Sequence, residues 1–510
     1  MLTLTPRTRR WPAPFPSPTG RGWREGAGAL SLLLLVVLLG CQSVHTPDWV
    51  RQRPPSAEEP FVVLWLKNNY FHPIGRLFSL DRHVAHLAGE TGEADHLLPA
   101  GSVADSSFYT NRDLTRLSPQ DIFRGATTDP PPTPPFTITK VKEGGAAQGF
   151  FGKDSLGARF LFKLDLPDYP ELTTGAEVVG SRLIWALGYN VPQMYIVTIQ
   201  GTGDPRFDGR RALASRFLSG DIIGPFKFNG VRDRREMRAL QLAQGWLNNV
   251  DCTDFNTLIT WEPGASPSPS VPPPASMDKG PSQGDVGVGL QTHPPTPQGE
   301  RRDRAGAHPV GALSAKSGPA EPPSPTRPSS PPSSASPRLR VETSSGETVA
   351  GVARYWILDF SSALGATDHG PKEPKQGWEH TWDVGQQVTD LFTLRLPPRP
   401  YDEKAKPFSP AVGLFDDNYD PRRWKPLMPN MAFLDMTEAD ARWLAAKIAA
   451  FTPEQLRAAI AAGEYSRQRD RDYLLQMLLR RQAIITRTFP PTPPASRVPV
   501  PPATATGQSL

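Results

Sequence analysis

Two short acidic segments hold the residue types best suited to chemistry in this chain. The first contains Asp251 and Asn256 within the run Asn-Val-Asp-Cys-Thr-Asp-Phe-Asn, and the second contains Asp359 directly after the apolar run Tyr-Trp-Ile-Leu. Carboxylate and amide oxygens are hard ligands that suit Mg²⁺. The spacing lets one loop direct Asp251 toward an acceptor hydroxyl while Asn256 turns back to a metal ion. We therefore expect Asp251 to act as the catalytic base, and Asn256 and Asp359 to bind Mg²⁺ on a nucleotide phosphate.

A cation and a flexible loop for the phosphates are expected earlier in the chain. Lys163 lies on an alternating strand and Glu177 on the helix that follows it. Lys163 is predicted to contact the phosphates of ATP or another nucleotide, with Glu177 holding it by an ion pair. Gly144, Gly145 and Gly149 lie in a loop that is predicted to close over the phosphates, because glycine permits close backbone approach.

The elements that must position these residues follow a regular order. Alternating apolar residues predict strands at 136–141, 158–164 and 193–199. Between the last two, apolar residues at helical spacing predict a helix over 174–187, with Gly188 as its stop. The order is strand, glycine loop, strand with a lysine, helix with a glutamate, strand.

The second half of the chain is predicted to be mainly helical around one hairpin. A helix over 232–249 leads into the first acidic segment. The pieces 258–261 and 352–358 are predicted to pair, with the Pro-, Ser- and Gly-rich insert 263–340 as a disordered connection. A hairpin tolerates such an insert because loop-closure entropy grows slowly with length.

Three helices are predicted near the C-terminus. Thr437 and Thr452 each open a capping-box pattern, and Pro453 follows the second at the first helical position. A third helix is predicted over 470–486. At the other end of the ordered chain, the apolar run 61–66 is predicted to be a strand.

Each candidate residue also has a purely structural explanation. The glycine run suits an ordinary hairpin turn, and Lys163 and Glu177 suit solvated faces of a strand and a helix. Asp359 could cap a turn, and Asp251 with Asp254 could cap the end of a connection. The phosphate-transfer hypothesis therefore depends on the order and separation of all these features together.

The acidic segments resemble those of atypical kinases, namely the HipA-type toxin kinases and the lipid kinases. The resemblance lies in residues 249–256 and in Asp-Phe-x-x-x-Leu-Gly at 359–365. Those families use Asn-x-Asp or Asp-Arg-His where protein kinases have His-Arg-Asp. Ser361 stands where many kinases have glycine, and no His or Arg precedes Asp251. The resemblance implies an α+β, two-lobed kinase-like fold with a small β-rich N-lobe and a helical C-lobe.

Most of residues 60–487 is also similar to a family of bacterial secreted proteins and lipoproteins without an assigned activity. The shared segments are 105–112, Glu177 with 186–192, 234–238 and 424–426. This second resemblance implies a fold rather than a reaction.

The N-terminus predicts export and lipid anchoring. Arg21 and Arg24 precede an apolar run of about twelve residues, which is short for a membrane span. That run ends in Leu-Leu-Gly-Cys, which resembles the bacterial lipobox and implies lipidation of Cys41. Gln42, rather than Asp, favours the outer membrane by analogy with lipoprotein sorting. An ordinary signal peptide or an uncleaved anchor is the alternative.

Composition limits the remaining possibilities. The chain has 510 residues with 59 Pro and a formal charge of only +5, so nucleic-acid binding is not expected. Cys252 has no cysteine partner after lipidation of Cys41, so no structural disulfide is expected. The predicted organisation is signal peptide 1–41, tether 42–59, accessory block 60–126, N-lobe 136–230, C-lobe 231–489 interrupted by 263–340, and disordered tail 490–510.

Two functions from different classes fit these observations. The first is a membrane-anchored, kinase-like phosphotransferase that uses Mg²⁺ and ATP or another nucleotide. The second is a catalytically silent kinase-fold lipoprotein that binds a protein or glycan of the cell envelope, because nucleotide is scarce there. A hydrolase using Asp251 and Asp254 is a third hypothesis and lacks a nucleophile. The chain is expected to be a monomer.

Overall fold

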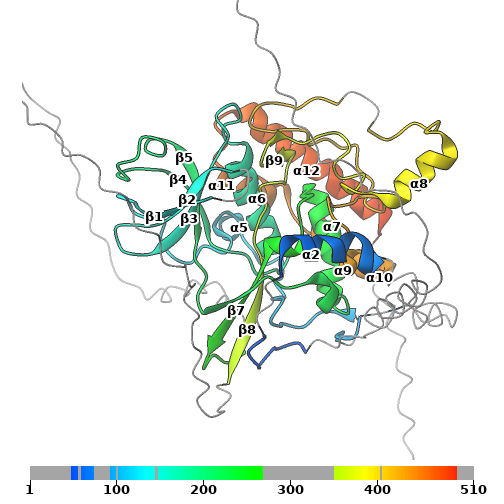
Figure 1. Ribbon diagram of the computed structural model, residues 1–510, viewed down its shortest axis with the longest axis horizontal. Helices are drawn as coiled ribbons and strands as arrows, with labels where there is room; N and C mark the ends of the chain where they lie inside the picture. The colour runs from blue at the N-terminus through cyan, green and yellow to red at the C-terminus, as the bar shows by residue number, and fades with distance from the viewer. Residues whose placement is uncertain are drawn as a thin grey trace, which may run out of the picture. The chain divides into compact units, whose positions relative to one another are not determined.

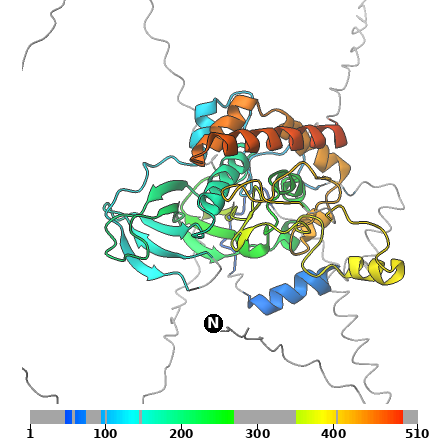
Figure 2. The same ribbon diagram turned by 90° about the horizontal axis from the view of Figure 1, so that it is seen from above.

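The protein has a mixed α and β fold, seen in a computed structural model (Figure 1). The structure describes residues 47–55, 59–73, 92, 94–98, 101–143, 147–267, 350–401 and 405–490. The predicted signal peptide with Cys41, Gly144 and Gly145, nearly all of the insert 263–340, and the tail after residue 490 lie outside these ranges. A five-stranded sheet occupies one end of the described part, and most helices lie at the other end (Figures 1 and 2).

The large sheet is antiparallel throughout, with the strand order β1-β2-β3-β5-β4. Its strands are β1 (Thr137–Val141), β2 (Gly149–Lys153), β3 (Arg159–Leu164), β4 (Met194–Thr198) and β5 (Arg211–Arg216). The strands predicted from alternation are confirmed. On β3, Phe160 and Phe162 are fully buried in an aromatic core with Phe136 and Phe150. Because successive side chains of a strand alternate in direction, Lys163 lies on the face opposite to Phe162.

Helix α6 (Leu172–Ala186) connects β3 to β4 and contacts β3, β4 and β5. Every residue of α6 is buried, so this helix is a core element rather than an amphipathic surface helix. Asp165 fixes its first turn, because its carboxylate accepts hydrogen bonds from the backbone amides of Thr173 and Thr174. The predicted helix over 174–187 is confirmed, and it begins two residues earlier.

A second, three-stranded antiparallel sheet has the order β6-β7-β8. Its strands are β6 (Asp221–Gly224), β7 (Thr257–Pro263) and β8 (Gly351–Ile357). Strand β7 pairs with β8 along its whole length, from Thr257 opposite Ile357 to Pro263 opposite Gly351. The predicted hairpin around the insert is therefore confirmed, and the residues before β7 and after β8 are held close together.

The helical part surrounds α7 (Arg235–Leu247), which contacts three other helices. These are α9 (Met431–Leu434), α10 (Glu438–Ala449) and α12 (Gln468–Thr488); α11 (Pro453–Ala462) packs against α12, α6 and the short α5 (Pro119–Arg124). The capping boxes predicted at Thr437 and Thr452 are both present. Helix α8 (Val384–Thr393) lies in a long segment that otherwise has little regular structure.

The predicted strand at 61–66 is wrong. Residues Phe61–Leu66 form helix α2, which continues into a π-helical turn over Lys67–Phe71. An unbroken apolar run carries no alternation, so its periodicity cannot separate a strand from a helix. In the structure, the side-chain amide of Asn68 donates to Asp254 at 2.9 Å and fixes the π-helical turn to the loop after α7.

The segment containing Phe108 and Tyr109 threads through the core rather than standing apart from it. Tyr109 forms a bridge with Tyr189 after α6, and the side-chain amide of Asn190 donates to the carbonyls of Ser107 and Tyr355 at 3.1 Å. Both aromatic rings are fully buried. These contacts join the segment to α6 and to β8, the two elements that carry Glu177 and lead to Asp359.

Candidate functional site

Lys163 lies at the centre of the candidate site. Its ammonium donates to Oε1 of Glu177 at 2.5 Å and to Oδ2 of Asp359 at 2.8 Å. The Lys163 side chain is 14% exposed and that of Asp359 is 23% exposed, so this contact lies at the edge of the core. The structure thus brings together side chains from β3, from α6 and from the segment after β8, and the predicted ion pair of Lys163 with Glu177 is present.

Glu177 connects Lys163 to the chain beyond Asp359. Its side chain is 1% exposed, and its second oxygen accepts a hydrogen bond from the backbone amide of Phe360 at 3.0 Å. Burial, together with the negative charge of Asp359, raises the pKa of Glu177 to about 8 against the opposing effect of Lys163.

Asp359 is held as an ionised carboxylate. Burial alone would raise its pKa, but the charge and hydrogen bond of Lys163 and the amide of Ser361 outweigh burial and lower it. The side-chain amide of Asn249 donates to the Asp359 carbonyl at 3.1 Å and to Gln244 at 2.9 Å. Asn249 therefore ties the end of β8 to the loop after α7.

The packing of Phe360 against α6 fixes the position of the preceding residue, Asp359. Phe360 is fully buried, and a Cβ atom on Gly180 would lie 2.8 Å from the Phe360 Cβ. Only glycine at position 180 therefore allows the helix to approach this closely. One turn further along the chain, the amide of Leu364 donates to the carbonyl of Leu247 at 2.8 Å and closes the segment onto α7.

The loop after α7 places Asp251 and Asn256 in the same region. Nδ2 of Asn256 donates to the backbone carbonyl of Asp251 at 2.5 Å, which leaves the side-chain oxygen of Asn256 as its remaining polar atom. Burial, followed by the negative charge of Asp359, raises the pKa of Asp251 to about 7. The two carboxylates therefore lie near enough to repel each other.

Gly149, the described part of the predicted glycine loop, lies directly opposite Lys163 in the β2–β3 pairing. A Cβ atom at this position would lie 2.0 Å from the Phe162 carbonyl oxygen, so the close contact of the two strands requires glycine. The loop before Gly149 therefore starts at the edge of the site. Gly144 and Gly145 lie outside the described residues, and their predicted contact with phosphate stays a prediction.

Sequence reasoning missed two charged residues of this site, Lys142 and Asp368. Lys142 follows β1 and donates to the Ala147 carbonyl at 3.0 Å; burial and the charge of Lys163 lower its pKa. Asp368 lies between the short strands β9 (Ala366–Thr367) and β10 (Gly370–Pro371). It interacts electrostatically with Asp251 and Lys142, and one of its oxygens is buried without a hydrogen-bond partner. A lysine two residues before a glycine run was the available signal for Lys142, whereas nothing in the sequence around Asp368 marks it.

Asp254 is not part of this arrangement. One of its oxygens accepts from the Phe228 amide at 2.9 Å and the other from Asn68 at 2.9 Å, and the side chain is buried. Both oxygens therefore serve to position the loop, and Asp254 offers no second carboxylate for a hydrolase. Cys252, also buried, is a free thiol.

The donor set fits a hard cation. Asp251, Asp359 and Asp368 supply carboxylate oxygens and Asn256 an amide oxygen, which are the ligand types that Mg²⁺ prefers alongside water and phosphate. In the described ranges, no group of three or more His, Cys, Asp or Glu side chains is arranged so that it could hold a metal ion, and the Mg²⁺ contacts of Asn256 and Asp359 stay a prediction.

Comparisons with protein-family models, with curated proteins and with solved structures found no match for this chain. None of the described helices is long and apolar enough to cross a membrane.

Proposed function

We propose that this protein is a phosphotransferase with a kinase-like, two-lobed fold that acts on a Mg²⁺-bound nucleotide. The observation that carries the proposal is the contact of one lysine on a central strand with carboxylates from a helix and from the segment after a buried strand. A lysine positioned by a helix glutamate beside a metal-binding aspartate is the arrangement that phosphoryl transfer requires of a kinase.

The chain order of the elements supports the same proposal. A β1-β2-β3-β5-β4 sheet with one helix between β3 and β4 precedes a mainly helical part, as a kinase-like N-lobe and C-lobe would. The resemblance of residues 249–256 and 359–365 to atypical kinases agrees with this order. The fold alone does not decide the activity, which rests on the side chains.

The side chains divide the work of transfer among them. Asp359 and the free oxygen of Asn256 would hold Mg²⁺, which when bound offsets the negative charge of the phosphates. Lys163 would turn from Asp359 to the phosphate oxygens while Glu177 keeps it in place.

Asp251 would accept the proton of the acceptor hydroxyl as that oxygen forms its bond to phosphorus. The bond to the leaving nucleoside diphosphate breaks at the same centre, and the leaving oxygen keeps the electron pair. With its pKa raised to about 7, Asp251 is well matched to a proton transfer near neutral pH.

Lipid anchoring through Cys41 in the outer membrane belongs to the same proposal. It depends on the lipobox-like run before Cys41, which precedes the described residues. Nucleotide is scarce at such a location, so the proposal requires a source of nucleotide in the cell envelope.

A catalytically silent protein of the same fold is the second candidate. It is favoured by the state of Asp359, whose two oxygens already accept hydrogen bonds from Lys163 and from the Ser361 amide. Mg²⁺ bound at Asp359 would compete with Lys163 for the same carboxylate. If that contact is permanent, the arrangement is a structural ion pair.

Nucleotide-dependent thermal stabilisation separates the two candidates. The purified chain would be heated with and without Mg²⁺ in the presence of ATP, ADP, GTP or CTP. The first candidate predicts a rise in melting temperature that needs both Mg²⁺ and nucleotide, because a ligand that binds only the native state stabilises it.

The matched variants are Asp359→Asn, which should lose the rise, and Asp417→Asn. Asp417 pairs with Arg480 on an exposed surface, so its variant should keep the rise. A folded wild-type chain that responds to none of the four nucleotides would favour the silent protein.

A further inference from the structure

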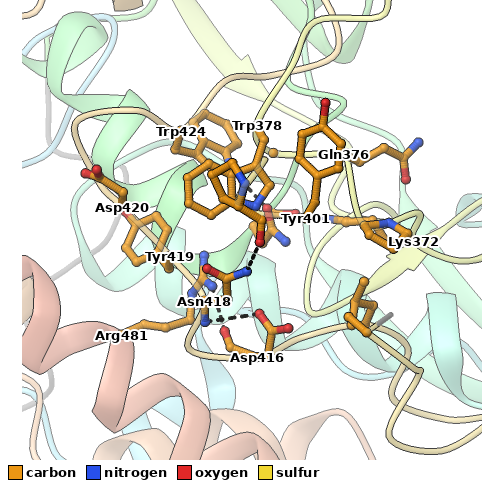
Figure 3. Close-up of a pocket in the computed structure, with 16 residues that line it drawn as sticks. Lys372, Gln376, Trp378, Tyr401, Asp416, Asn418, Tyr419, Asp420, Trp424 and Arg481 are labelled. Atoms are coloured by element: carbon orange, nitrogen blue, oxygen red, sulfur yellow. Dashed lines mark hydrogen bonds between the residues drawn. The ribbon is translucent and has the colours of Figure 1, made fainter. Parts of the chain in front are cut away.

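A cavity of about 330 Å³ adjoins the candidate site without containing it (Figure 3). Asn248, the residue that ends α7, lines this cavity and lies three positions before Asp251. None of the residues proposed for phosphate transfer lines it. The cavity has the size of small-molecule sites in proteins, and no step of the proposed transfer uses it.

Aromatic rings form one side of this cavity. Figure 3 shows Trp378, Trp424 and Tyr401 gathered together, with Asp416 and Arg481 across from them. Trp424 is held rigidly, because its ring nitrogen donates to Asn248 Oδ1 at 2.9 Å and its side chain is buried. Trp378 and Tyr401 are only half-buried, and the guanidinium of Arg423 lies over one face of the Trp378 ring at 5.7 Å.

Two aromatic residues of the cavity, Tyr419 and Trp424, lie against Gly245 of α7. A Cβ atom on Gly245 would lie 2.9 Å from the Tyr419 hydroxyl oxygen and 3.3 Å from the Trp424 ring. Glycine at this point therefore lets the aromatic wall lie against the helix backbone. The positions of Tyr419 and Trp424 are therefore fixed by their contact with this buried helix.

The cations of the cavity are already engaged. Arg481 donates to the main-chain carbonyls of Trp246, Asp416 and Gly245, and its guanidinium stacks on the Tyr419 ring at 3.9 Å. Lys372 donates to the carbonyls of Asn248 and Ser362. Most donors of these two side chains are therefore directed at main-chain carbonyls. An organic cation would find the Tyr419 ring taken by Arg481.

The remaining polar groups mainly accept hydrogen bonds. Asp416 and Asp420 line the cavity, and each uses one oxygen on a backbone amide nearby, that of Asn418 and that of Arg422. Their other oxygens are left for hydroxyl donors. Gln376 contributes an amide group on the same lining.

We propose that this cavity binds a sugar unit of a glycan. A pyranose ring has an apolar C–H face that packs on Trp378 and Tyr401, and a rim of hydroxyl groups that donates to the carboxylates of Asp416 and Asp420. The lining has two carboxylates, and its two cations are bonded to main-chain carbonyls, which favours a neutral sugar over a phosphate or a sulfate.

A second cavity indicates that the glycan is longer than one sugar. This cavity has a volume of about 310 Å³ and shares Trp378 and Trp424 with the first. Its other polar lining residues include Gln241, His380 and Arg423. The two cavities share this pair of tryptophan side chains, so consecutive sugar units of one chain would contact both.

Calorimetric titration of the full-length chain with defined oligosaccharides tests this proposal. The probes are the tetrasaccharides of β-1,4-linked N-acetylglucosamine, β-1,4-linked glucose and α-1,4-linked glucose, each with its monosaccharide. We expect at least one tetrasaccharide to bind, and to bind more tightly than its monosaccharide because two cavities are filled. Failure of all three tetrasaccharides at about 10 mM, where even the weakest specific contacts register, would overturn the proposal.

Matched variants show where the sugar binds. Trp378→Ala should weaken binding at least about ten-fold, and so should Asp416→Asn, which keeps the side-chain volume. Trp382→Ala removes a nearby tryptophan that is half exposed and lines neither cavity, so it should bind as the wild type does. Unchanged affinity in both Trp378→Ala and Asp416→Asn, with normal melting temperatures, would also overturn the proposal. Nucleotide binding is measured separately, so either result stands without the other.

Discussion

Replacing Glu177 with glutamine removes the carboxylate that links the Lys163 ammonium to the Phe360 amide. Both oxygens of Glu177 accept hydrogen bonds, from Lys163 at 2.5 Å and from Phe360 at 3.0 Å. Glutamine has one acceptor oxygen, and its nitrogen can only donate. One of the two buried donors is therefore left without an acceptor in the Glu177→Gln variant.

The size of the loss follows from that count. Leaving one buried donor unpaired costs about 1–3 kcal/mol of the free energy of unfolding. Lys163 still has Asp359 as a partner, so the loss should stay below the cost of isolating a buried charge, about 3–5 kcal/mol. We expect the variant to be about 1–3 kcal/mol less stable than the wild type at pH 5.

The difference should shrink as the pH rises. The pKa of Glu177 is about 8 in the folded chain against an ordinary value of 4.5, so between these values the native state binds a proton that the unfolded state has lost. The stability that this proton contributes is present in full below pH 4.5 and is lost as the pH rises through 8. Glutamine cannot titrate, so the wild type should lose at most about 1.4 kcal/mol per pH unit relative to Glu177→Gln in this window. Between pH 5 and pH 8 the loss sums to about 3–4 kcal/mol, which closes the difference and reverses its sign.

Urea unfolding of both proteins at pH 5, 6, 7 and 8 measures this difference. The matched control is Glu454→Gln, which changes an exposed carboxylate paired with Arg457 and should show no such narrowing. A gap between wild type and Glu177→Gln that stays constant from pH 5 to pH 8 would refute the proton assignment. A variant as stable as the wild type at pH 5 would refute the hydrogen-bond arrangement itself.

Further substitutions test the other parts of the site. Asp251→Asn should keep nucleotide-dependent stabilisation while the rate of phosphate transfer falls about 10²–10⁴-fold, measured with labelled nucleotide. In the wild type, the rate of phosphate transfer should increase with pH up to about 7 and then level off. The reason is that burial raises the pKa of Asp251 to about 7, and only the ionised base accepts the proton. A rate independent of pH between 5 and 8 would contradict this role. Gly180→Ala should lower the free energy of unfolding in urea by about 1–3 kcal/mol, since its Cβ would lie 2.8 Å from the Phe360 Cβ. Gly230→Ala, with open space around its Cβ, should change stability little. Equal stability of the two alanine variants would show that α6 does not press on Phe360.

The sequence predicted best where local chemistry decides the structure. Capping residues such as Thr437 and Thr452 mark helix starts because their side chains satisfy free backbone amides within the same turn. The pairing of Lys163 with Glu177 was also predictable, since a strand and the following helix are adjacent in space when the connection is short.

Contacts between distant segments were less accessible. Asp368 and Lys142 reach the site through turns whose direction depends on tertiary packing. The apolar run 61–66 forms a helix that leads into a turn whose Asn68 contacts Asp254 in the loop after α7, a partner far away in the sequence. No periodicity in either segment carries that information.

The two cavities show the same limit more strongly. Their walls come largely from residues 372–426, where regular secondary structure is sparse and hydrophobic periodicity has no meaning. The ring of Trp424 is positioned by Asn248, a residue far away in the sequence. Such a wall can be recognised only after the fold has brought the segments together.

A crystal structure of the chain with Mg²⁺ and a non-hydrolysable ATP analogue would test the central claim most directly. The account predicts that Lys163 has left Asp359 for a phosphate oxygen and that Mg²⁺ lies about 2.1 Å from oxygens of Asp359 and Asn256. Glu177 should still contact Lys163. Crystals grown with saturating Mg²⁺ and analogue in which the contact of Lys163 with Asp359 is unchanged, and no nucleotide lies beside it, would contradict the account.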